Sequence, residues 1–409
     1  MKYVIILGDG MADYPIDELG GMTPLEYART PNMDEIAARG TLGLVDTIPE
    51  GMAPASDVAN MSILGYDPRT CYSGRGPLEA ASMGVELAPQ DVAFRCNLVT
   101  LEENHGNRMA DYTAGQISSQ EASEIMNDLN TSLGDSEVKF YPGVSFRHLL
   151  VWTKGRDDLT TTPPHDITGK LVREYLPQGE GAEMLNALMR RSQDFLLSHP
   201  INKARLSQGM RPATTIWPWG QGRKPTMKRI TDEYHLTGGM ISAVDLLHGI
   251  ARYAGLDSLH VQGATGYTDT NYSGKGKKTI EALKERDLVF VHVEAPDAMG
   301  HEGNLAGKIR AIEDFDNLVV GQILQAMPSF GDYRLMVTSD HPTPISLMTH
   351  SSDPSPFAVL SNLPRENQGR SYNFGETAAK TSGILITPGF KLFQFFINSW
   401  NKVIDSRMK

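Results

Sequence analysis

Six aspartate and histidine residues of this chain stand where ligand-binding residues are expected. They follow short apolar runs that are typical of buried strands, in the segments YVIILGD, EAPDAMGHEG, TSDHPTP and MTHSSDPSPF. Ligands of an open parallel sheet gather outside the carboxyl ends of its strands, so these side chains are expected to converge at one edge. The six residues are Asp9, Asp297, His301, Asp340, His341 and His350.

Carboxylates and imidazoles without cysteine suit Zn²⁺, Mn²⁺ or similar ions. With Ser56 there are seven candidate ligands, which is too many for one ion and suits two ions that share a bridging position. Two neighbouring ions form the clamp that enzymes use in phosphoryl transfer. Taken alone, Asp9 could be a turn residue and Asp297 a helix cap. Because all of them stand near predicted strand ends, the metal interpretation is favoured.

Ser56 lies in GMAPASDVANMSILGYDP, where a loop turns into a helix. Serine is a preferred N-cap, and Asp57 in the first turn favours a helix start, so one interpretation is purely structural. The other is a nucleophile, because the N-terminus of a helix favours an alkoxide or an attached phosphate. The local sequence leaves both interpretations open.

The pattern around these residues predicts an α/β fold in which helices flank a mainly parallel sheet. The chain opens with a strand, a helix that has Pro31 in its first turn and Gly40 at its end, and another strand. The same alternation returns late in the chain. The expected strands are 3–9, 41–48, 288–295, 333–340 and 383–390, and the expected helices are 30–40, 275–287 and 305–327.

The middle of the chain differs from both ends. Between about 90 and 235, strand-like segments such as RHLLVWT alternate with helices and with loops rich in Pro, Gly and Thr. We therefore expect a core domain of residues 1–90 and 236–409 and a smaller inserted α+β domain of residues 91–235. A length of 409 residues also favours two domains.

Composition excludes several classes of protein. A formal net charge of -11 argues against nucleic-acid binding, and there is no apolar run of about 18 residues to span a membrane. Two cysteines, Cys71 and Cys96, form no disulfide framework, so a cytoplasmic protein is expected. Neither G-x-G-x-x-G after a strand nor G-x-x-x-x-G-K-[ST] occurs, so no motif supports a Rossmann or P-loop site.

The chain resembles the archaeal-type, cofactor-independent phosphoglycerate mutase family of the alkaline phosphatase superfamily. The resemblance runs nearly end to end and is carried by GDGMAD, PASDVANMSILGYDP, YSGRGPLEAAS, HVEAPDAMGHEGN, TSDHPTP and THSSDPSPF. It implies an alkaline-phosphatase-like core, a serine that is phosphorylated and then returns the phosphate, and a small phosphorylated substrate. It also implies two divalent ions, with Mn²⁺ expected and Zn²⁺ or Mg²⁺ as alternatives, and no 2,3-bisphosphoglycerate.

The resemblance also assigns roles to the candidate residues. Ser56 would be the nucleophile. One ion would be bound by Asp297, His301 and His350, and the other by Asp9, Asp340, His341 and Ser56.

A second set of polar residues could bind the substrate. Arg75 lies between glycines in YSGRGP, which suits a bidentate phosphate contact, and Lys275 directly precedes a predicted helix. The simpler alternative is a set of solvated loop residues. The resemblance adds to this set five residues of the inserted domain, namely Arg147, His165, Asp166, Asn202 and Arg205.

The function implied is the interconversion of 3-phosphoglycerate and 2-phosphoglycerate. An alternative keeps the metals and the serine but transfers phosphate to L-homoserine, as a homoserine kinase in threonine synthesis would. A phosphomonoesterase is less favoured, since an inserted domain suits the exclusion of water. A sulfatase is not favoured, because SDVAN stands where C/S-x-P-x-R would be needed. The sequence makes no prediction of oligomeric state.

Overall fold

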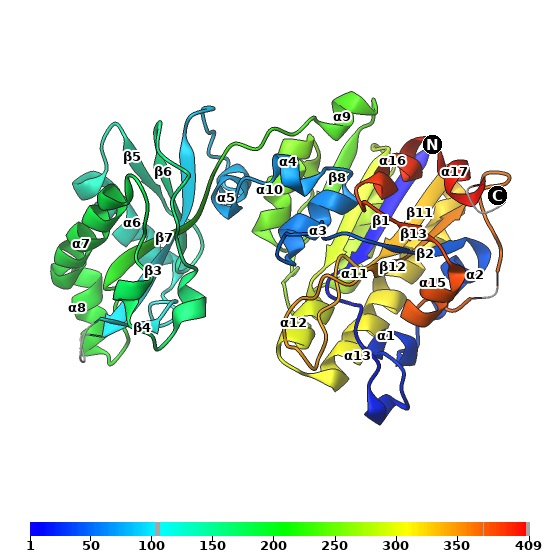
Figure 1. The fold of residues 1–409 in the computed structure, drawn as a ribbon, viewed down its shortest axis with the longest axis horizontal. Coiled ribbons are helices and arrows are strands. Elements are labelled where there is room, and N and C mark those ends of the chain that lie inside the picture. The colour runs from blue at the N-terminus through cyan, green and yellow to red at the C-terminus, as the bar shows by residue number, and fades with distance from the viewer. Residues whose placement is uncertain (103–106, 371, 406–409) are drawn as a thin grey trace. The chain divides into compact units, whose positions relative to one another are not determined.

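The computed structural model describes residues 1–102, 107–370 and 372–405, and the chain forms two compact units. Unit 1 contains Met1–Tyr72 and the described residues from Thr226 onward, and unit 2 contains Ser73–Pro225. Unit 2 is therefore a continuous insertion into unit 1, and each unit is described by itself below (Figure 1).

Unit 1 is built around an eight-stranded sheet. The central strand β1 (Lys2–Gly8) is parallel to both of its neighbours, β10 (Leu288–Val293) and β11 (Tyr333–Thr338) (Figure 1). Among the described strand pairs of this sheet, only those of β12 (Ser355–Ser361) with β11 and with β2 (Thr41–Val45) are antiparallel. The order across the sheet is β13 (Leu385–Ile386), β2 (Thr41–Val45), β12 (Ser355–Ser361), β11, β1, β10, β8 (Gly238–Ile241) and β9 (Asp257–Ser258).

The central strands are parallel and buried because their residues are apolar on both faces. In β1 every residue after Lys2 is buried, and β10 and β11 are buried throughout. Such strands need helices on both sides of the sheet, which is what the predicted alternation of strands and helices supplies. The fold class predicted from the sequence, a mainly parallel sheet with flanking helices, is therefore confirmed.

Helices connect the strands of unit 1. Side chains of α2 and α13 pack with β1, β10 and β11 in one core cluster. Helix α3 packs against α10 and α16. No helix in the described part of the chain is both long and apolar enough to cross a membrane. The helices are α1 (Pro24–Tyr27), α2 (Pro31–Arg39), α3 (Ser56–Ile63), α4 (Pro68–Cys71), α9 (Ile230–Glu233), α10 (Asp245–Ala254), α11 (Tyr272–Ala282), α12 (Ala295–His301), α13 (Leu305–Phe315), α14 (Gly321–Ala326), α15 (Glu376–Ser382), α16 (Lys391–Asn398) and α17 (Trp400–Asp405).

The long helix expected at 305–327 contains a π-helical turn. Residues Asp316–Val320 form this turn between α13 and α14. Asp316 is buried there, and its carboxylate accepts hydrogen bonds from the Asn32 and Met33 amides at the start of α2. These amides have no partner within their own helix, so the turn places a carboxylate where α2 needs one.

Unit 2 is an α+β structure with an antiparallel five-stranded sheet (Figure 1). One core cluster contains apolar residues of α6, α7 and the sheet, and a smaller one includes Ala80 of α5. The strands are β3 (Val92–Glu102), β4 (Arg108–Asp111), β5 (Val138–Tyr141), β6 (Arg147–Trp152) and β7 (Thr215–Arg223). The helices are α5 (Arg75–Ser82), α6 (Ser119–Leu133), α7 (Ala182–Ser198) and α8 (Pro200–Ser207).

The limits of unit 2 differ from the segment 91–235 expected from the sequence. Helix α5 lies before residue 91 but packs on the sheet of unit 2, where Ala80 joins Ala93 and Leu149. Residues after 225 belong to unit 1, because the Tyr66 hydroxyl donates to the Lys228 carbonyl at 2.6 Å. Both differences arise from packing that sequence composition does not reveal.

Candidate metal centre and nucleophile

The three central strands of unit 1 end side by side. β1 pairs in register with β10 up to Gly8 opposite Val293, and with β11 up to Leu7 opposite Thr338. The Asp9 amide still donates to the Val293 carbonyl at 2.9 Å. The residues that follow these strands therefore meet at one edge of the sheet, as expected for a parallel arrangement.

Asp9, Asp340 and His341 form a first cluster at this edge, which we call the inner group. All three are 0% exposed. His341 Nε2 lies 3.6 Å from Asp9 Oδ1 and 3.3 Å from Asp340 Oδ2. Burial and the neighbouring Asp340 carboxylate raise the pKa of Asp9 well above its ordinary value, and burial lowers the pKa of His341.

Asp297, His301 and His350 form a second cluster, the outer group. Asp297 and His301 are four residues apart on α12, so they lie on one face of that helix. Their closest side-chain atoms, Oδ2 and Nε2, are 3.2 Å apart, and His350 Nε2 is 3.4 Å from Asp297 Oδ1. Burial raises the pKa of Asp297, but the hydrogen bonds from both imidazoles outweigh it and hold that pKa well below its ordinary value.

The atoms of both groups fit divalent cations. Within each group one ligand atom per residue lies within 4.8 Å of the others. His301 Nε2 and His350 Nε2 are 2.8 Å apart, while their Nδ1 atoms face the carbonyls of Met348 and Pro54. With each Nδ1 donating to a carbonyl, both Nε2 atoms face each other and the Asp297 carboxylate, an arrangement that suits a cation held by all three residues. Asp9 Oδ1 is buried without a hydrogen-bond partner among the described residues.

Ser56 is the first residue of α3, and the N-cap of that helix is Ala55. The serine Oγ lies 3.1 Å from His341 Nε2. One turn later, Asn60 Nδ2 donates to the Ser56 carbonyl at 2.8 Å and to Asp340 Oδ2 at 3.0 Å. Ser56 is therefore not the N-cap of α3, and its hydroxyl faces the inner group.

A third cluster of ligand types was not predicted. It contains Asp9, His292 and Glu294, and its ligand atoms also lie within 4.8 Å of one another. His292 Nε2 is 2.7 Å from Asp9 Oδ2 and 3.6 Å from Glu294 Oε2. The signal in the sequence was a histidine inside the apolar run LVFVHVEA, since a polar residue in a buried strand needs a partner.

Two further residues at the edge were missed. Thr343 Oγ1 donates to Asp297 Oδ1 at 2.5 Å and lies 3.3 Å from His341 Nδ1, so it touches a member of each group. Asn60 ties Ser56 to Asp340, as described above. Asn60 is four residues after Ser56 and hence on the same helix face, which is a signal that the sequence did offer.

Comparison with known proteins places this centre in a family. The family model of 2,3-bisphosphoglycerate-independent phosphoglycerate mutase matches residues 37–202. A Geobacter sulfurreducens protein named as a probable mutase of this kind is 52% identical over 399 residues, which cover 97% of this chain and 100% of that protein. The chain belongs to this family. A mutase of the same name from Methanosarcina barkeri is 54% identical, and the match covers 94% of this chain and 96% of that protein.

Solved structures agree with membership of the mutase family. A protein from Pyrococcus horikoshii has a TM-score of 0.81 and 31% identity, with 98% of this chain and 97% of that chain covered. A cofactor-independent phosphoglycerate mutase from Thermoplasma acidophilum has a TM-score of 0.65 and 25% identity, with 98% and 100% covered. The homoserine kinase alternative finds no support among these relatives.

The residues predicted to bind the substrate differ from one another in burial and in their hydrogen-bond partners. Lys275, in α11 of unit 1, is 0% exposed, and its ammonium donates to the His292 carbonyl at 2.9 Å. Burial lowers the pKa of Lys275 to about 8, although Glu294 opposes this shift. Lys275 therefore lies behind the metal-binding edge and has no solvent-exposed surface with which to meet a substrate.

Four of the predicted substrate-binding residues, all in unit 2, have polar groups that are exposed or lack a hydrogen-bond partner among the described residues. Arg75 starts α5, and its Nε is buried without a hydrogen-bond partner among the described residues. The His165 side chain is 46% exposed and lies 3.7 Å from the exposed carboxylate of Asp166. Arg147 is exposed, with its guanidinium 5.4 Å from the centre of the Phe146 ring.

The prediction that Asn202 and Arg205 face a substrate is corrected by the structure. Both are 2% exposed. The Arg205 guanidinium directs all its N–H groups to Glu121 and to the carbonyls of Ala114, Gly115 and Arg211. The Asn202 amide donates to two carbonyls and accepts from the Ala213 amide. These side chains hold the loops of unit 2 together and have no donor left for a ligand.

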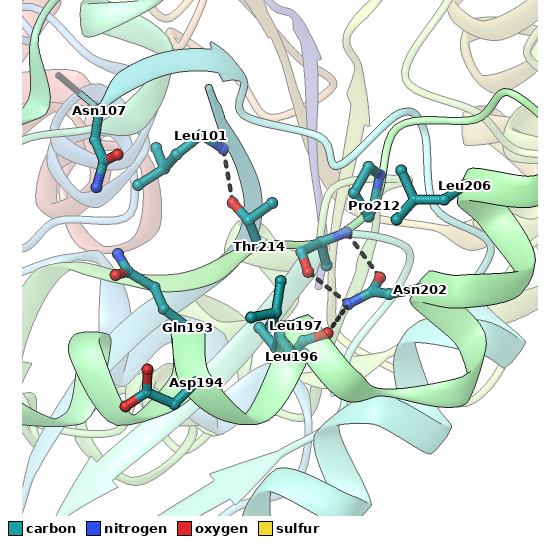
Figure 2. A pocket seen from close by; sticks show the side chains of 11 residues that line it. Leu101, Asn107, Gln193, Asp194, Leu196, Leu197, Asn202, Leu206, Pro212 and Thr214 are labelled. Atoms are coloured by element: carbon teal, nitrogen blue, oxygen red, sulfur yellow. Dashed lines mark hydrogen bonds between the residues drawn. The ribbon is translucent and has the colours of Figure 1, made fainter. Parts of the chain in front are cut away.

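Asn202 also lines a cavity of about 230 Å³ in unit 2. Figure 2 shows its amide hydrogen-bonded to backbone groups in the cavity wall. The described lining contains several leucines and no histidine. Asp194 is the one carboxylate of this described lining, and no group of metal ligands like those of unit 1 surrounds it, so this cavity is not the centre at which phosphoryl transfer is expected.

Proposed function

We propose that this chain interconverts 3-phosphoglycerate and 2-phosphoglycerate through a phosphoserine at Ser56. The observation that carries the proposal is the position of Ser56 Oγ, 3.1 Å from His341 Nε2 of the inner group. This oxygen belongs to the first residue of a helix, where negative charge is favoured. Membership of the mutase family supplies the substrate class, a small phosphorylated acid.

In this proposal the inner group together with Ser56 holds one divalent ion and the outer group holds another. We expect Mn²⁺, with Zn²⁺ and Mg²⁺ as the alternatives that the ligand types allow. When bound, the ions supply positive charge that lowers the pKa of a serine hydroxyl and offsets the charge of phosphoryl oxygens. The Asp9 Oδ1 atom, which has no hydrogen-bond partner among the described residues, and the convergence of His301 Nε2 and His350 Nε2 on Asp297 support this assignment.

The reaction has two halves. In the first, Ser56 Oγ bonds to phosphorus while the bond from phosphorus to O3 of the glycerate breaks, and the serine proton passes to that oxygen. In the second, O2 of the glycerate bonds to phosphorus while the bond from phosphorus to Ser56 Oγ breaks, and the O2 proton passes to Oγ. No atom is oxidised or reduced. Because Ser56 carries the phosphoryl group between the halves, no 2,3-bisphosphoglycerate is needed.

Asn60 keeps the nucleophile in place through both halves. Its amide nitrogen bridges the Ser56 carbonyl and Asp340 Oδ2. This bridge couples the first turn of α3 to the inner group, so the backbone that carries Ser56 is held against a ligand of that group. Such fixed placement is how a site converts a bimolecular attack into an oriented one.

We assign substrate binding and the exclusion of water to unit 2. Burial and the charges of Asp166, Arg75 and Arg95 act on His165, and together they lower its pKa. The Arg95 guanidinium lies 4.8 Å from the centre of the Trp219 ring. Arg95 is paired with Glu79 at 3.3 Å, so the Arg75 guanidinium is the group near this imidazole that we expect to bind the phosphate or carboxylate of phosphoglycerate.

The test is turnover of Mn²⁺-loaded protein on 3-phosphoglycerate alone. Formation of 2-phosphoglycerate, with a phosphoryl group recovered on Ser56 by mass spectrometry, is the expected result. A parallel reaction with ATP and L-homoserine should give no O-phosphohomoserine. Release of inorganic phosphate without 2-phosphoglycerate would instead make the protein a phosphomonoesterase and overturn the proposal.

A further inference from the structure

His292 is a completely buried histidine whose two ring nitrogens both have partners. Nε2 lies 2.7 Å from Asp9 Oδ2, and Nδ1 lies 3.2 Å from Ser242 Oγ. By ligand type alone, Asp9, His292 and Glu294 could form a third ion site. The hydrogen bonds around His292 point to a different role.

Ser242 decides which nitrogen of His292 carries the proton. Ser242 Oγ accepts a hydrogen bond from the Val244 amide at 3.0 Å, and His292 Nδ1 is the acceptor within reach of its own hydrogen. The serine backbone is also held, since His248 Nε2 lies 3.1 Å from the Ser242 carbonyl. With Nδ1 accepting, the ring proton is on Nε2, which donates to Asp9 Oδ2.

This hydrogen bond gives the two oxygens of the Asp9 carboxylate different surroundings. Oδ2 accepts from His292, while Oδ1 is buried without a hydrogen-bond partner in the described part of the chain and lies 3.6 Å from His341 Nε2. Asp9 therefore presents one oxygen to the inner group and is held from behind by the other. An Nε2 that carries a proton also has no lone pair to offer to an ion.

Below its pKa of about 8, the Lys275 side chain places a positive charge beside His292. The ammonium of Lys275 is fully buried and donates to the His292 carbonyl at 2.9 Å. A fixed cation next to this cluster reduces the electrostatic need for a further divalent ion there.

We infer that His292, oriented by Ser242, is a positioning residue that fixes Asp9 for the inner ion, and that the third cluster is not a third ion site. The inference rests on the proposed function, because it takes Asp9 to be a metal ligand. It predicts that removal of the Nε2 donor weakens the inner ion without altering the nucleophile or the outer group.

Two substitutions of the same residue test this. In His292→Gln the amide nitrogen reaches the position of Nε2 and keeps a donor to Asp9. In His292→Asn the shorter amide reaches only the position of Nδ1, so that donor is lost. We expect the unaltered protein to bind two Mn²⁺ ions and the Gln variant to bind them equally well. The Asn variant should bind one of the two about 10–100-fold more weakly.

Further readouts separate positioning from a general structural role. At saturating Mn²⁺ the Asn variant should recover kcat, which a displaced nucleophile would not. With the metal removed by chelation, the Gln and Asn variants should unfold at the same temperature. If the Asn variant is too unstable to study, Ser242→Ala should show a smaller loss of Mn²⁺ affinity of the same kind.

The inference is overturned if the Asn variant binds both ions as tightly as the unaltered protein, or if the unaltered protein binds a third ion that both variants lose. Asp9→Ala distinguishes this failure from failure of the proposed function. If Asp9→Ala still binds two ions, the metal assignment itself is wrong. If Asp9→Ala loses an ion while His292→Asn does not, only the positioning role is wrong.

Discussion

The inner and outer groups lie at the same sheet edge but differ in composition and exposure. The inner group has two carboxylates and one imidazole, all 0% exposed. The outer group has one carboxylate and two imidazoles, and the side chains of His301 and His350 are 39% and 20% exposed. The inner group therefore combines more negative charge with less water, and it should hold a cation more tightly and release it more slowly.

The contacts that support the two groups also differ. The segments that carry Asp9 and Asp340 are joined by Lys308, a wholly buried residue whose ammonium donates to Asp13 Oδ2 and to the carbonyls of Ala12 and Thr343. In the outer group, His301 Nδ1 and His350 Nδ1 face loop carbonyls. The comparison predicts a rigid inner site and a more labile outer site.

The largest expected effect comes from Ser56→Ala. Loss of the nucleophile should lower turnover by about 10⁴-fold or more. The metal content should stay at two ions, because each group keeps its three aspartate and histidine side chains. Turnover of 3-phosphoglycerate and metal analysis of the same sample check both statements. Near-normal turnover would show that Ser56 is not the nucleophile, and loss of one ion would show that the serine is needed to hold it.

The metal-binding edge could be predicted from sequence because it depends on topology. A strand that ends in aspartate, such as β1 before Asp9, places that residue at the edge whatever the packing elsewhere. The local sequence did not decide between a cap and a nucleophile at Ser56, because the choice between Ser56 and Ala55 as the N-cap is a matter of one residue in backbone geometry. The nucleophile role was predicted from the resemblance to the mutase family. The sequence also did not show that the strand expected at 383–390 pairs over only Leu385–Ile386.

The second prediction concerns acid. Protons compete with a metal for imidazole nitrogens, and the outer group has two imidazoles to the inner group's one. Below the pKa of its histidines, metal affinity should fall about tenfold per pH unit for each imidazole that must lose a proton. Lowering the pH from about 8 to about 5 should therefore remove the outer ion first.

Metal content and turnover measured across that range test this order, and the Ser56→Ala protein is a matched control that lacks the nucleophile. Turnover should fall together with the loss of the first ion. Loss of both ions in one step would show that the two groups do not differ in acid sensitivity. If the first ion lost is the one that Asp9→Ala also removes, the inner group is the more acid-sensitive of the two.

Two residues of unit 2 show what the sequence could not predict. Arg205 and Asn202 stand in a polar stretch whose composition equally suits a ligand site and a solvated surface. The structure gives a third outcome, in which both side chains are buried and hydrogen-bonded to backbone. A polar residue's partner is fixed by tertiary contacts, so sequence can identify the residue type but not whether its donors remain free.

The third prediction concerns the support of the inner group. In Lys308→Met the carboxylate of Asp13 stays buried without its ammonium partner, which should lower the free energy of unfolding by about 3–5 kcal/mol. In this variant the affinity for the inner ion should fall more than the affinity for the outer ion, because the segments carrying Asp9 and Asp340 lose a shared contact. Denaturant unfolding and Mn²⁺ titration measure the two effects.

A double variant provides the control for Lys308. Lys308→Met with Asp13→Asn removes both charges, so it should be more stable than Lys308→Met alone. Equal stability of the single and double variants would mean that the ion pair does not support this edge. Equal loss of Mn²⁺ affinity in both groups would mean that the support is not specific to the inner group.

The smallest expected effect lies one contact further from the inner group. Glu376 Oε1 accepts from the Asp13 amide and Oε2 from Thr23 Oγ1, and burial raises the pKa of Glu376 to about 7. An unfolded glutamate loses its proton near pH 4.5. Between these values the folded protein holds a proton that the unfolded chain has released, so this contribution to stability is complete below about pH 4.5 and is lost as the pH rises through about 7.

Glu376→Gln keeps an acceptor for the Asp13 amide and has no proton to lose. The variant should therefore gain stability over the unaltered protein as the pH rises, by at most about 3 kcal/mol at pH 8, because solvent still reaches part of the residue. Denaturant unfolding at about pH 5 and pH 8 measures the difference. A constant gap between the two proteins would show that Glu376 is already ionised in the folded state, and that the network behind the inner group contains one more negative charge than this comparison assumes.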